Sequence, residues 1–287
     1  MKIVCVGNLN QDITLFMKRY PKKHEKIEAQ NILISNGGSS ANTACWLSKS
    51  GIQTIFLGSV GDDSAGRAQI KELRSYGVKT THIRVSELST GRAIIMQTST
   101  DKRMIKHAGA NTEIRLNKKL LRNAHWVHAS SMNKELRNEL FNYCYDNNII
   151  LSYDPGSNTP SRKELKMIKY LFINEDELSR ITKRLNIVDS ARKCGAENVL
   201  VGLNNGGAIF VNKDFMVSIP KIKINDFVDG TGAGDAGNAG FIYGILKGKK
   251  IIEAVKLKVI LSNYKIGFKG ARTGIKNIKF FYKYLKK

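Results

Sequence analysis

Cysteine is scarce in this sequence, and the few cysteines present lie far apart. Four are spread over 287 residues, at positions 5, 45, 144 and 194, and none forms a CxxC pair. Disulfide frameworks and zinc sites use closely spaced cysteines, so this spacing argues against both. Sparse, isolated thiols are typical of a protein that lives in the reducing cytosol.

Long apolar runs are absent as well. No uninterrupted stretch approaches the roughly 18–20 residues needed to cross a bilayer. The apolar part of the N-terminal "MKIVCVGNLNQD" is too short for a signal peptide and predicts a first strand instead. Apolar residues make up 42% of the chain, enough for a substantial globular core. We therefore expect a cytoplasmic protein that has no membrane partner.

Acidic residues are few relative to basic ones. The chain has 24 of them against 47 lysines and arginines, for a net charge of +23. Such an excess favours acidic ligands, including nucleotides and nucleic acids. However, the lysines are scattered, and the sequence has neither a basic tail nor a basic stripe interleaved with aromatic residues. This pattern indicates a solvated lysine-rich surface and weighs against nucleic acid as the partner.

Short apolar runs alternate with helical periods along most of the chain. The runs predict buried strands at 2–7, 54–58, 125–129, 149–153, 170–173 and 198–202. Amphipathic stretches predict helices at 40–51, 65–77 and 133–148, with Asn133 as an N-cap and Gly51 as a terminating glycine. This alternation predicts an α/β fold with a doubly wound, mostly parallel sheet, formed by one domain over residues 1–287.

Two segments, at about 12–36 and 84–107, break this rhythm. Both contain extended, partly alternating runs such as "KIEAQNILIS" and "GRAIIMQTST", without a strong helical pattern. Antiparallel strands inserted into an α/β core form a small sheet that can cover the open ends of the parallel strands, where ligands bind. We expect these two segments to form a β-sheet lid.

Glycine is concentrated in "DGTGAGDAG", residues 229–237, just before the helical pattern of "NAGFIYGIL". At such a loop-to-helix junction, free N–H groups and the helix dipole attract anions, and Gly232 and Gly234 let a phosphate approach the backbone. Asp235 would repel that phosphate unless it has a role there. A general base that takes a proton from an attacking hydroxyl has such a role, so the segment predicts a phosphoryl-transfer site.

Two other interpretations of this segment stay open. "GAGDAG" (232–237) matches the dinucleotide fingerprint G-x-G-x-x-G, with Glu253 about 20 residues further on, although Glu253 falls within a helical pattern. Asp235 could also be a plain helix cap, which leaves the density of glycine unexplained. A Walker-type loop, G-x-x-x-x-G-K-[ST], is absent from the sequence.

Together these segments resemble the ribokinase-like (PfkB) family of carbohydrate kinases. "DGTGAGDAGNAGF" (229–241) resembles its C-terminal signature and "GGSSANTACWLSKSG" (37–51) its N-terminal one, with "GNLNQD" (7–12), "HAGAN" (107–111), "YDPGSN" (153–158) and "NEDE" (174–177) in family order. The resemblance covers nearly the whole chain. It implies a Rossmann-like α/β domain with a lid, and ATP-dependent phosphorylation of a hydroxymethyl group on a sugar or ribonucleoside, with a lean towards the nucleoside-kinase-like branch.

The resemblance also implies roles for single residues. Asp235 corresponds to the catalytic base, and Gly232, Ala233 and Gly234 correspond to the anion hole. Substrate-binding positions of the family fall on Asp12, Gly38 and Asn42, and Arg103 on the lid is a further candidate for substrate or phosphate. Asp154 and Asn158 are candidates near the phosphate path.

The implied cofactors are ATP and Mg²⁺, with a monovalent cation as a further candidate. Asn174 and Glu177 fall on the N-x-x-E motif that organises Mg²⁺ and its waters, and they would also make a capping pair at a helix start. The nucleotide site falls on Gly202, Asn204, Gly207 and Asn263. Here the chain departs from the T-x-G turn that is frequent in the family, and Ser39 stands where typical ribokinases carry a lysine.

Three classes of function therefore compete. The favoured one is a sugar or nucleoside kinase, with a homodimer through the lid as a candidate assembly. A second is a nucleotide-sensing or basic nucleic-acid-binding protein that keeps the fold without catalysis, and a third is a nicotinamide-dependent dehydrogenase. The presence of Asp235, Asn174 and Glu177 favours catalysis, while the identity of the acceptor stays open.

Overall fold

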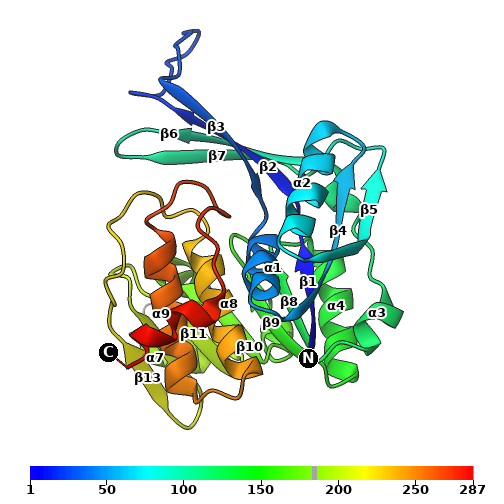
Figure 1. The fold of residues 1–287 in the computed structure, drawn as a ribbon, viewed down its shortest axis with the longest axis vertical. Helices are drawn as coiled ribbons and strands as arrows, with labels where there is room; N and C mark the ends of the chain where they lie inside the picture. Colours follow the sequence, from blue (N-terminus) through cyan, green and yellow to red (C-terminus); the bar gives the residue numbers. More distant parts are fainter. Residues whose placement is uncertain (183–185, 287) are drawn as a thin grey trace.

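A nine-stranded sheet forms the centre of the computed structural model, which describes residues 1–182 and 186–286. Its strands lie in the order β13-β12-β11-β10-β9-β8-β1-β4-β5 (Figure 1). Neighbours from β11 to β5 pair in parallel, and β12 and β13 are added antiparallel. The strands are β1 (Lys2–Gly7), β4 (Gln53–Gly61), β5 (Lys79–Ser86), β8 (Trp126–Ser130), β9 (Ile150–Asp154), β10 (Tyr170–Asn174), β11 (Asn198–Gly202), β12 (Ala208–Val211) and β13 (Met216–Ile219).

Helices cover both faces of this sheet, because successive side chains of its strands point to opposite sides. In β1, Ile3 and Cys5 pack with α1 (Ser39–Lys49), α8 (Ala233–Leu246) and α9 (Ile251–Lys265), while Val4 and Val6 pack towards the other layer. The remaining helices are α2 (Ser64–Ser75), α3 (Lys118–Arg122), α4 (Lys134–Asp146), α5 (Arg162–Leu165), α6 (Glu175–Ile181) and α7 (Ile187–Cys194), with 3₁₀ turns η1 (Gly109–Glu113) and η2 (Ile278–Tyr284). The doubly wound, mostly parallel architecture predicted from the sequence is confirmed.

The predicted elements of the core are present with small shifts at their ends. All six predicted strands occur, as β1, β4, β8, β9, β10 and β11, and the three predicted helices are α1, α2 and α4. The Asn133 side chain accepts a hydrogen bond from the Leu136 N–H at 2.8 Å, which is the expected N-cap. Gly51 has φ +81° just after α1, as a helix-terminating glycine requires.

A second sheet of four strands projects from one end of the core (Figure 1). Its order is β3-β2-β6-β7, with bounds β2 (Asn10–Phe16), β3 (Asn31–Gly37), β6 (Gly91–Gln97) and β7 (Lys102–His107). The outer pairs are antiparallel, but β2 and β6 pair in parallel, so the sheet is mixed rather than antiparallel as expected. The parallel pair forms because β2 and β6 both leave the core in the same direction. We call this sheet the lid sheet.

The segment predicted for the second half of the lid begins too early. Residues 84–86 complete β5 and pair with Ser59, Val60 and Gly61 of β4 in the core sheet. At the sheet edge, β5 alternates exposed and buried side chains much as a lid strand does, so its sequence pattern does not separate the two.

All four lid strands join the core at the same end of the lid sheet. Asn10, the first residue of β2, pairs with Gly37 at the end of β3 and with Gly91 at the start of β6, and His107 at the end of β7 pairs with Arg92. The loops 17–30 and 98–101 lie at the far end. The lid sheet is therefore anchored along one short row of residues.

Candidate active site

The N-termini of α1 and α8 meet at the carboxylate of Asp235. Ser39, the first residue of α1, donates its hydroxyl hydrogen to Asp235 Oδ1 at 2.5 Å. One turn later, Asn42 donates its Nδ2 hydrogen to Asp235 Oδ2 at 2.7 Å. The two donors lie on one face of α1 because residues three apart are neighbours on a helix. Only 9% of Asp235 is exposed, so both carboxylate oxygens are held in place within the protein.

Burial raises the pKa of Asp235, and the hydrogen bonds from Ser39 and Asn42 oppose that rise. The positive charges of Arg272 and Lys258 also lower the pKa of this carboxyl group. A raised pKa makes a carboxylate a better proton acceptor than an exposed aspartate. The side chain is therefore suited to act as a base, which a simple helix cap would not require.

The backbone at the start of α8 leaves room and hydrogen-bond donors beside this carboxylate. Gly232, the N-cap, has φ +79°, and a Cβ there would lie 2.6 Å from the Ala271 carbonyl oxygen. A Cβ at Gly234 would meet nothing within 4 Å, so that position opens onto free space. The Ala233 N–H donates to the Gly230 carbonyl at 3.2 Å. Within the described residues, no acceptor takes the N–H groups of Gly234 and Asp235, and these two can bind an anion.

A cavity of about 540 Å³ lies between the lid sheet on one side and, on the other, the loop that precedes α8 and the loop that follows α9. Lid residues such as Asp12, Thr14 and Ile95 line one side, and residues 227–231 and 269–270 line the other. Asp235 is not among the lining residues, but Thr231, which lies four positions before it in the sequence, is. The volume is suited to a small polar ligand rather than a macromolecule.

Two acidic side chains of the lid line this cavity, Asp12 on β2 and Asp101 in the loop 98–101. Burial raises the pKa of Asp12 to about 6, against the opposing charges of Arg272, Lys102 and Lys106. The negative charge of Asp235 also raises the pKa of Asp12. Gly38, another predicted substrate position, is the N-cap of α1 with φ +114° and contributes backbone rather than a side chain.

The structure does not bring Arg103 to the cavity. Arg103 pairs in register with Met96, whereas the neighbouring pair Gln97 and Lys102 lines the cavity. Because side chains alternate across a strand, Arg103 points to the opposite face, where it lies over the Tyr20 ring at 3.9 Å and pairs with Asp101. The predicted role of Arg103 at the substrate gains no support from this geometry and stays a prediction, and Lys102 is the basic side chain of β7 that lines the cavity.

Asn174 and Glu177 form the capping box that the sequence also allowed. Asn174 Oδ1 accepts from the Glu177 N–H at 2.8 Å, and Glu177 Oε2 accepts from the Asn174 N–H at 3.0 Å. Burial raises the pKa of Glu177. Within the described residues no cluster of three or more His, Cys, Asp or Glu side chains could hold a metal ion alone. The oxygen donors here fit Mg²⁺ instead, which binds few protein ligands and keeps several waters.

A buried polar chain connects α9, α8 and the end of β9. Lys258 donates to Asn238 Oδ1 at 2.9 Å, and Asn238 donates to Asp154 Oδ2 at 2.7 Å. Burial and the charges of Asp235 and Glu177 raise the pKa of Asp154 to about 7, and burial lowers that of Lys258 to about 8. The charges of Asp235 and Glu177 thus act on the pKa of both Asp154 and Lys258. Asn158 instead donates to the Met132 carbonyl, away from this chain.

The predicted nucleotide positions gather at the ends of β10 and β11. Gly202 pairs with Asn174, and the Asn204 N–H donates to Glu175 at 2.7 Å. Asn263 is 2% exposed, and its amide donates to the carbonyls of Gly206 and Val259. Asn263 therefore holds the 203–207 turn against α9, and Gly207 is the residue at which that turn enters β12.

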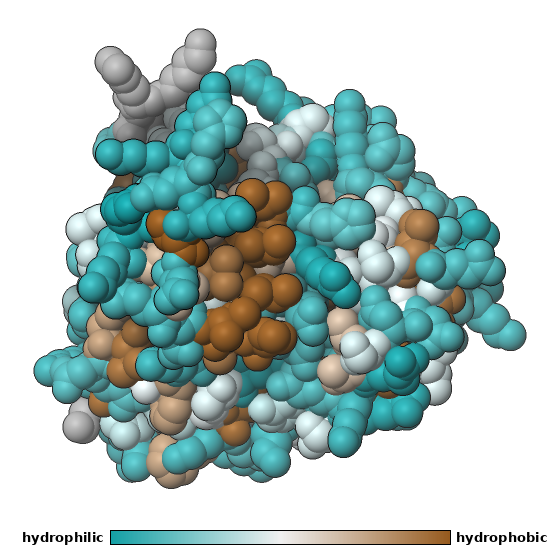
Figure 2. Space-filling model, turned by 90° about the horizontal axis from the view of Figure 1, so that it is seen from above, coloured by the Kyte–Doolittle hydropathy of each residue, from teal (hydrophilic) through white to brown (hydrophobic). Residues whose placement is uncertain are grey.

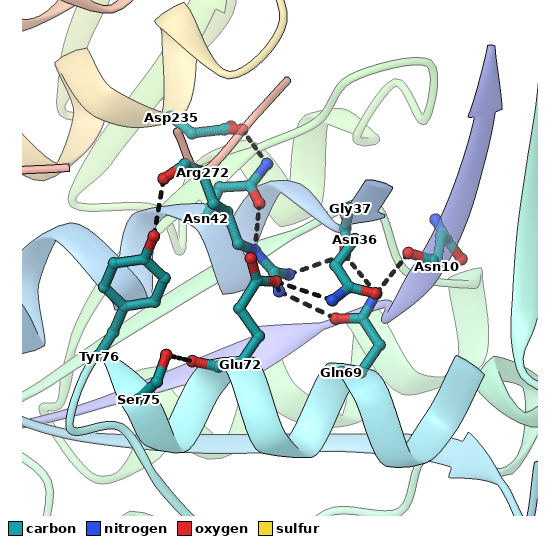
Figure 3. Close-up of polar contacts among 10 residues, drawn as sticks. All are labelled: Asn10, Asn36, Gly37, Asn42, Gln69, Glu72, Ser75, Tyr76, Asp235 and Arg272. Atoms are coloured by element: carbon teal, nitrogen blue, oxygen red, sulfur yellow. Dashed lines mark hydrogen bonds and ion pairs between the residues drawn. The ribbon is translucent and has the colours of Figure 1, made fainter. Parts of the chain in front are cut away.

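Sequence reasoning missed Arg272, which lies at the centre of a buried network (Figure 3). Its guanidinium donates to Asn42 Oδ1 at 2.9 Å, to Gln69 Oε1 at 3.0 Å, to Glu72 Oε2 at 2.7 Å and to the Gly37 carbonyl at 3.0 Å. A lone arginine in a basic C-terminal segment gives no sequence signal, since its partners lie about 200 or more positions away.

Comparison with known proteins agrees with this geometry. A model of the pfkB family of carbohydrate kinases matches residues 1–277. The chain belongs to this family. A ribokinase of Lactococcus lactis is 27% identical to the kinase over 285 residues, covering 96% of this chain and 93% of that protein. A nucleoside kinase of Methanocaldococcus jannaschii is 24% identical over 294 residues, covering 96% and 93%.

The kinase also superimposes on solved structures of the same fold. The structure of Arabidopsis thaliana ribokinase complexed with ribose and ATP has a TM-score of 0.89 at 28% identity, and the match covers 100% of this chain and 98% of that one. The expected ribokinase-like fold and the expected carbohydrate or nucleoside kinase class are confirmed. In the described part of the kinase, no helix has the length and apolarity to cross a bilayer.

Proposed function

We propose that residues 1–287 act as one ATP- and Mg²⁺-dependent kinase domain that phosphorylates a hydroxymethyl group of a sugar or ribonucleoside. One arrangement carries the proposal. The buried Asp235 carboxylate, oriented by Ser39 and Asn42, adjoins the free N–H groups at the start of α8. A proton acceptor and anion-binding donors on one helical turn are what the attack of an alcohol on a phosphoryl group needs.

In the proposed reaction, Asp235 takes the proton of the acceptor hydroxyl while the oxygen of that hydroxyl forms a bond to the γ-phosphorus of ATP. The bond between that phosphorus and the β–γ bridging oxygen breaks, and ADP leaves. The N–H groups of Gly234 and Asp235 bind the oxygens of the transferred group, and Gly232 sets the backbone angle that exposes them. Most of the acceleration comes from positioning and electrostatic stabilisation, because little covalent chemistry falls to the protein.

Glu177 and Asn174 are the residues proposed to hold Mg²⁺ through its waters. The ion supplies charge neutralisation at the phosphate oxygens when it is bound. Glu177 retains a second carboxylate oxygen beyond the one used in the capping box, and the hydrogen bond from the Asn174 N–H orients the side chain. The ends of β10 and β11, with Gly202 and Asn204, offer the adjoining surface for the nucleotide.

The acceptor is proposed to lie in the cavity beneath the lid sheet. Asp12 there can accept hydrogen bonds from acceptor hydroxyls, and closure of the lid sheet would exclude water that would otherwise hydrolyse ATP. The relatives named ribokinase and nucleoside kinase support both acceptor classes. The cavity is also lined by Phe16, Leu33 and Phe227, which can contact an apolar ring face.

The test is a screen of sugars and nucleosides with Mg²⁺ and ATP, in which ADP release is measured. We expect Asp235→Asn to lose at least about 10²-fold in turnover with its thermal unfolding unchanged. The control is Asp226→Asn, an exposed aspartate paired with Lys223, which should keep full turnover. Near-normal turnover of Asp235→Asn would overturn the assignment of the base.

The competing nucleic-acid function makes a different prediction in a binding assay. Binding to a phosphate backbone weakens steeply with salt, whereas binding of a small acceptor in a cavity does not. Strong salt-dependent binding of nucleic acid by a chain without ADP release would favour that alternative over the kinase.

We further propose that the kinase forms a homodimer through the outer face of the lid sheet. Four isoleucines lie in register across this face, Ile34, Ile13, Ile94 and Ile105, and three of them are exposed. Figure 2, a view from above, shows an apolar patch on this side of the molecule. Contiguous apolar patches of this kind mark association surfaces.

Light scattering should report a dimer for the wild type and a monomer for Ile94→Lys. The control Ile252→Lys, on α9, should remain a dimer. A monomeric wild type would refute the proposal.

A further inference from the structure

We infer that Arg272 is a positioning residue for the transfer reaction. It helps to orient Asn42, the hydrogen-bond partner of the proposed base Asp235, and connects Asn42 to the row of residues where the lid sheet joins the core. The inference rests on the proposed role of Asp235 as the base. Arg272 lies in the segment that follows α9, and only 3% of it is exposed. Among the described residues, its guanidinium donates to Asn42, Gln69, Glu72 and Gly37 and makes no hydrogen bond to the loops 227–231 and 269–270 that line the cavity (Figure 3). Its influence on the reaction therefore has to pass through other side chains.

The first step concerns the orientation of the Asn42 amide. A guanidinium has only donors, so the Asn42 atom that faces Arg272 Nε at 2.9 Å has to be the amide oxygen. The NH₂ group of Asn42 then points the other way, at Asp235 Oδ2. The carboxylate and the guanidinium therefore select the same orientation of the amide, and without Arg272 only the carboxylate would hold it. Arg272 thus supports a hydrogen bond of the base that it does not itself touch.

The second step concerns the lid sheet. Arg272 donates to the Gly37 carbonyl at the end of β3 and to Glu72 on α2, and Glu72 also accepts from Asn36 at 2.9 Å. Gln69, another partner of Arg272, donates to the carbonyl of Asn10 at the start of β2. Both β2 and β3 are therefore connected to Arg272 at the row where the lid sheet joins the core.

If the row where the lid sheet joins the core is displaced, the Arg272 guanidinium has to move with it, and this is the same group that contacts Asn42. Hydrogen bonds in such a buried network are geometrically demanding, so the arrangement around the base depends on where the lid strands begin and end. Tyr76 adds a further restraint, since its hydroxyl donates to the Arg272 carbonyl at 2.9 Å. The alternative is that Arg272 only stabilises the fold, as a buried arginine with an acidic partner commonly does.

The two readings differ in the pH dependence of turnover. The charged groups that face Asp235 are Arg272, Lys258 and Lys265, which are basic, and Asp12 and Asp154, which are acidic. The Arg272 charge lowers the pKa of Asp235. Removal of that charge raises the pKa, so the base is protonated up to a higher pH and the acid limb of kcat moves upward.

The experiment measures kcat at saturating acceptor against pH for Arg272→Met and Arg272→Lys. Arg272→Met should lower kcat by about 10²-fold through misplacement of Asn42 and the base, move the acid limb to higher pH and leave the KM for ATP within about twofold. Arg272→Lys keeps the charge but not the Nε–H, so its acid limb should stay in place while kcat falls by about tenfold.

Arg137→Met is the matched control. Arg137 is also buried and pairs with Glu164 at 2.6 Å, but between α4 and α5 and with no link to Asp235. It should lower the melting temperature without moving the acid limb. Wild-type kcat and pH profile in folded Arg272→Met would overturn the inference; if that variant does not fold, wild-type kcat in Arg272→Lys would do the same. Failure of the proposed function is distinguishable, since Asp235→Asn would then keep its activity.

Discussion

The side-chain amide of Asn42 donates to the Asp235 carboxylate at 2.7 Å, although 193 positions separate the two residues. Asn42 lies in the first turn of α1 and Asp235 in the first turn of α8, so the positive ends of two helices meet at one carboxylate. This convergence favours the charged form of Asp235, and burial opposes it. The balance leaves a carboxylate that two hydrogen bonds hold in place and whose pKa lies above that of an ordinary aspartate.

Replacement of Ser39 by alanine should change the pH range in which Asp235 can act as the base. The Ser39 hydroxyl stabilises the ionised carboxylate, so its loss raises the pKa of Asp235 further. Because the base works only when deprotonated, the acid limb of the kcat profile should move to higher pH, and turnover should recover in alkaline solution. A pH series of kcat at saturating substrates measures this shift.

Ser262→Ala is the control for that series. Its hydroxyl donates to the Ala233 carbonyl at 2.9 Å, close to the same helix start but not to the carboxylate. The acid limb of this variant should coincide with that of the wild type. Equal shifts in both variants would show that the effect is not a property of the Ser39 hydrogen bond.

Two glycines three residues or fewer from Asp235 should respond oppositely to alanine. Gly232→Ala places a Cβ against the Ala271 carbonyl at a positive φ, and should destabilise the protein by about 1–3 kcal/mol. Gly234→Ala meets open space inside a helix, so it should leave stability unchanged or raise it by about 0.5–1 kcal/mol. Thermal or denaturant unfolding of both variants measures the difference.

Activity should separate the same two variants in another way. If a phosphoryl group occupies the space beside Gly234, the stable Gly234→Ala variant should lose about 10²-fold in turnover, because its methyl group keeps the phosphate from the N–H groups. A fully active Gly234→Ala would contradict the proposed position of the anion.

Glu177→Gln should weaken the response to Mg²⁺ without loosening the fold. Glutamine can still accept from the Asn174 N–H and complete the capping box, while the carboxylate charge near the ion is lost. We expect the Mg²⁺ concentration for half-maximal activity to rise by about tenfold. Glu253→Gln is the control, because Glu253 has the same capping position on α9, and it should behave as the wild type.

Asp12 should confer a pH dependence on acceptor binding. Its pKa is raised to about 6 by burial, so the carboxylate is lost as the pH falls through that value. Protonation removes a charged acceptor for the substrate hydroxyls, and the KM for the acceptor should therefore rise below pH 6. Asp12→Asn should show the higher KM at every pH, with the KM for ATP unaffected. A KM that stays constant between pH 5 and 8 in the wild type would contradict this role.

Local patterns were sufficient for most of the core and for the start of α8. Strand and helix periods identified β1 and α4, and the glycine density together with Asp235 identified a loop-to-helix junction. These features are short-range, since they depend on residues within a few positions of one another. The same holds for the capping box of Asn174 and Glu177, which its spacing alone predicts.

Features that depend on distant contacts were not accessible in this way. Lys258 and Lys265 occur in a lysine-rich helix that reads as a solvated surface, yet α9 is buried and both amines have partners inside the protein. Arg272 likewise finds its buried partners far away in the sequence. Arg103 is different, because side chains alternate along β7. Knowledge of the lid register would therefore have placed Arg103 on the face opposite to Lys102.

The lid sheet joins the core at one end, along the row of Gly37, Asn10 and Gly91, which we call its root. β2 extends from Asn10 at the root to Phe16, which gives a lever arm of roughly 20 Å at about 3.3 Å per residue. A tilt of about 10° at the root therefore sweeps the free tip through roughly 3–4 Å. In the proposed reaction, small adjustments among Gln69, Glu72 and Arg272 at the root would therefore produce much larger displacements at the tip, beside the cavity proposed to hold the acceptor.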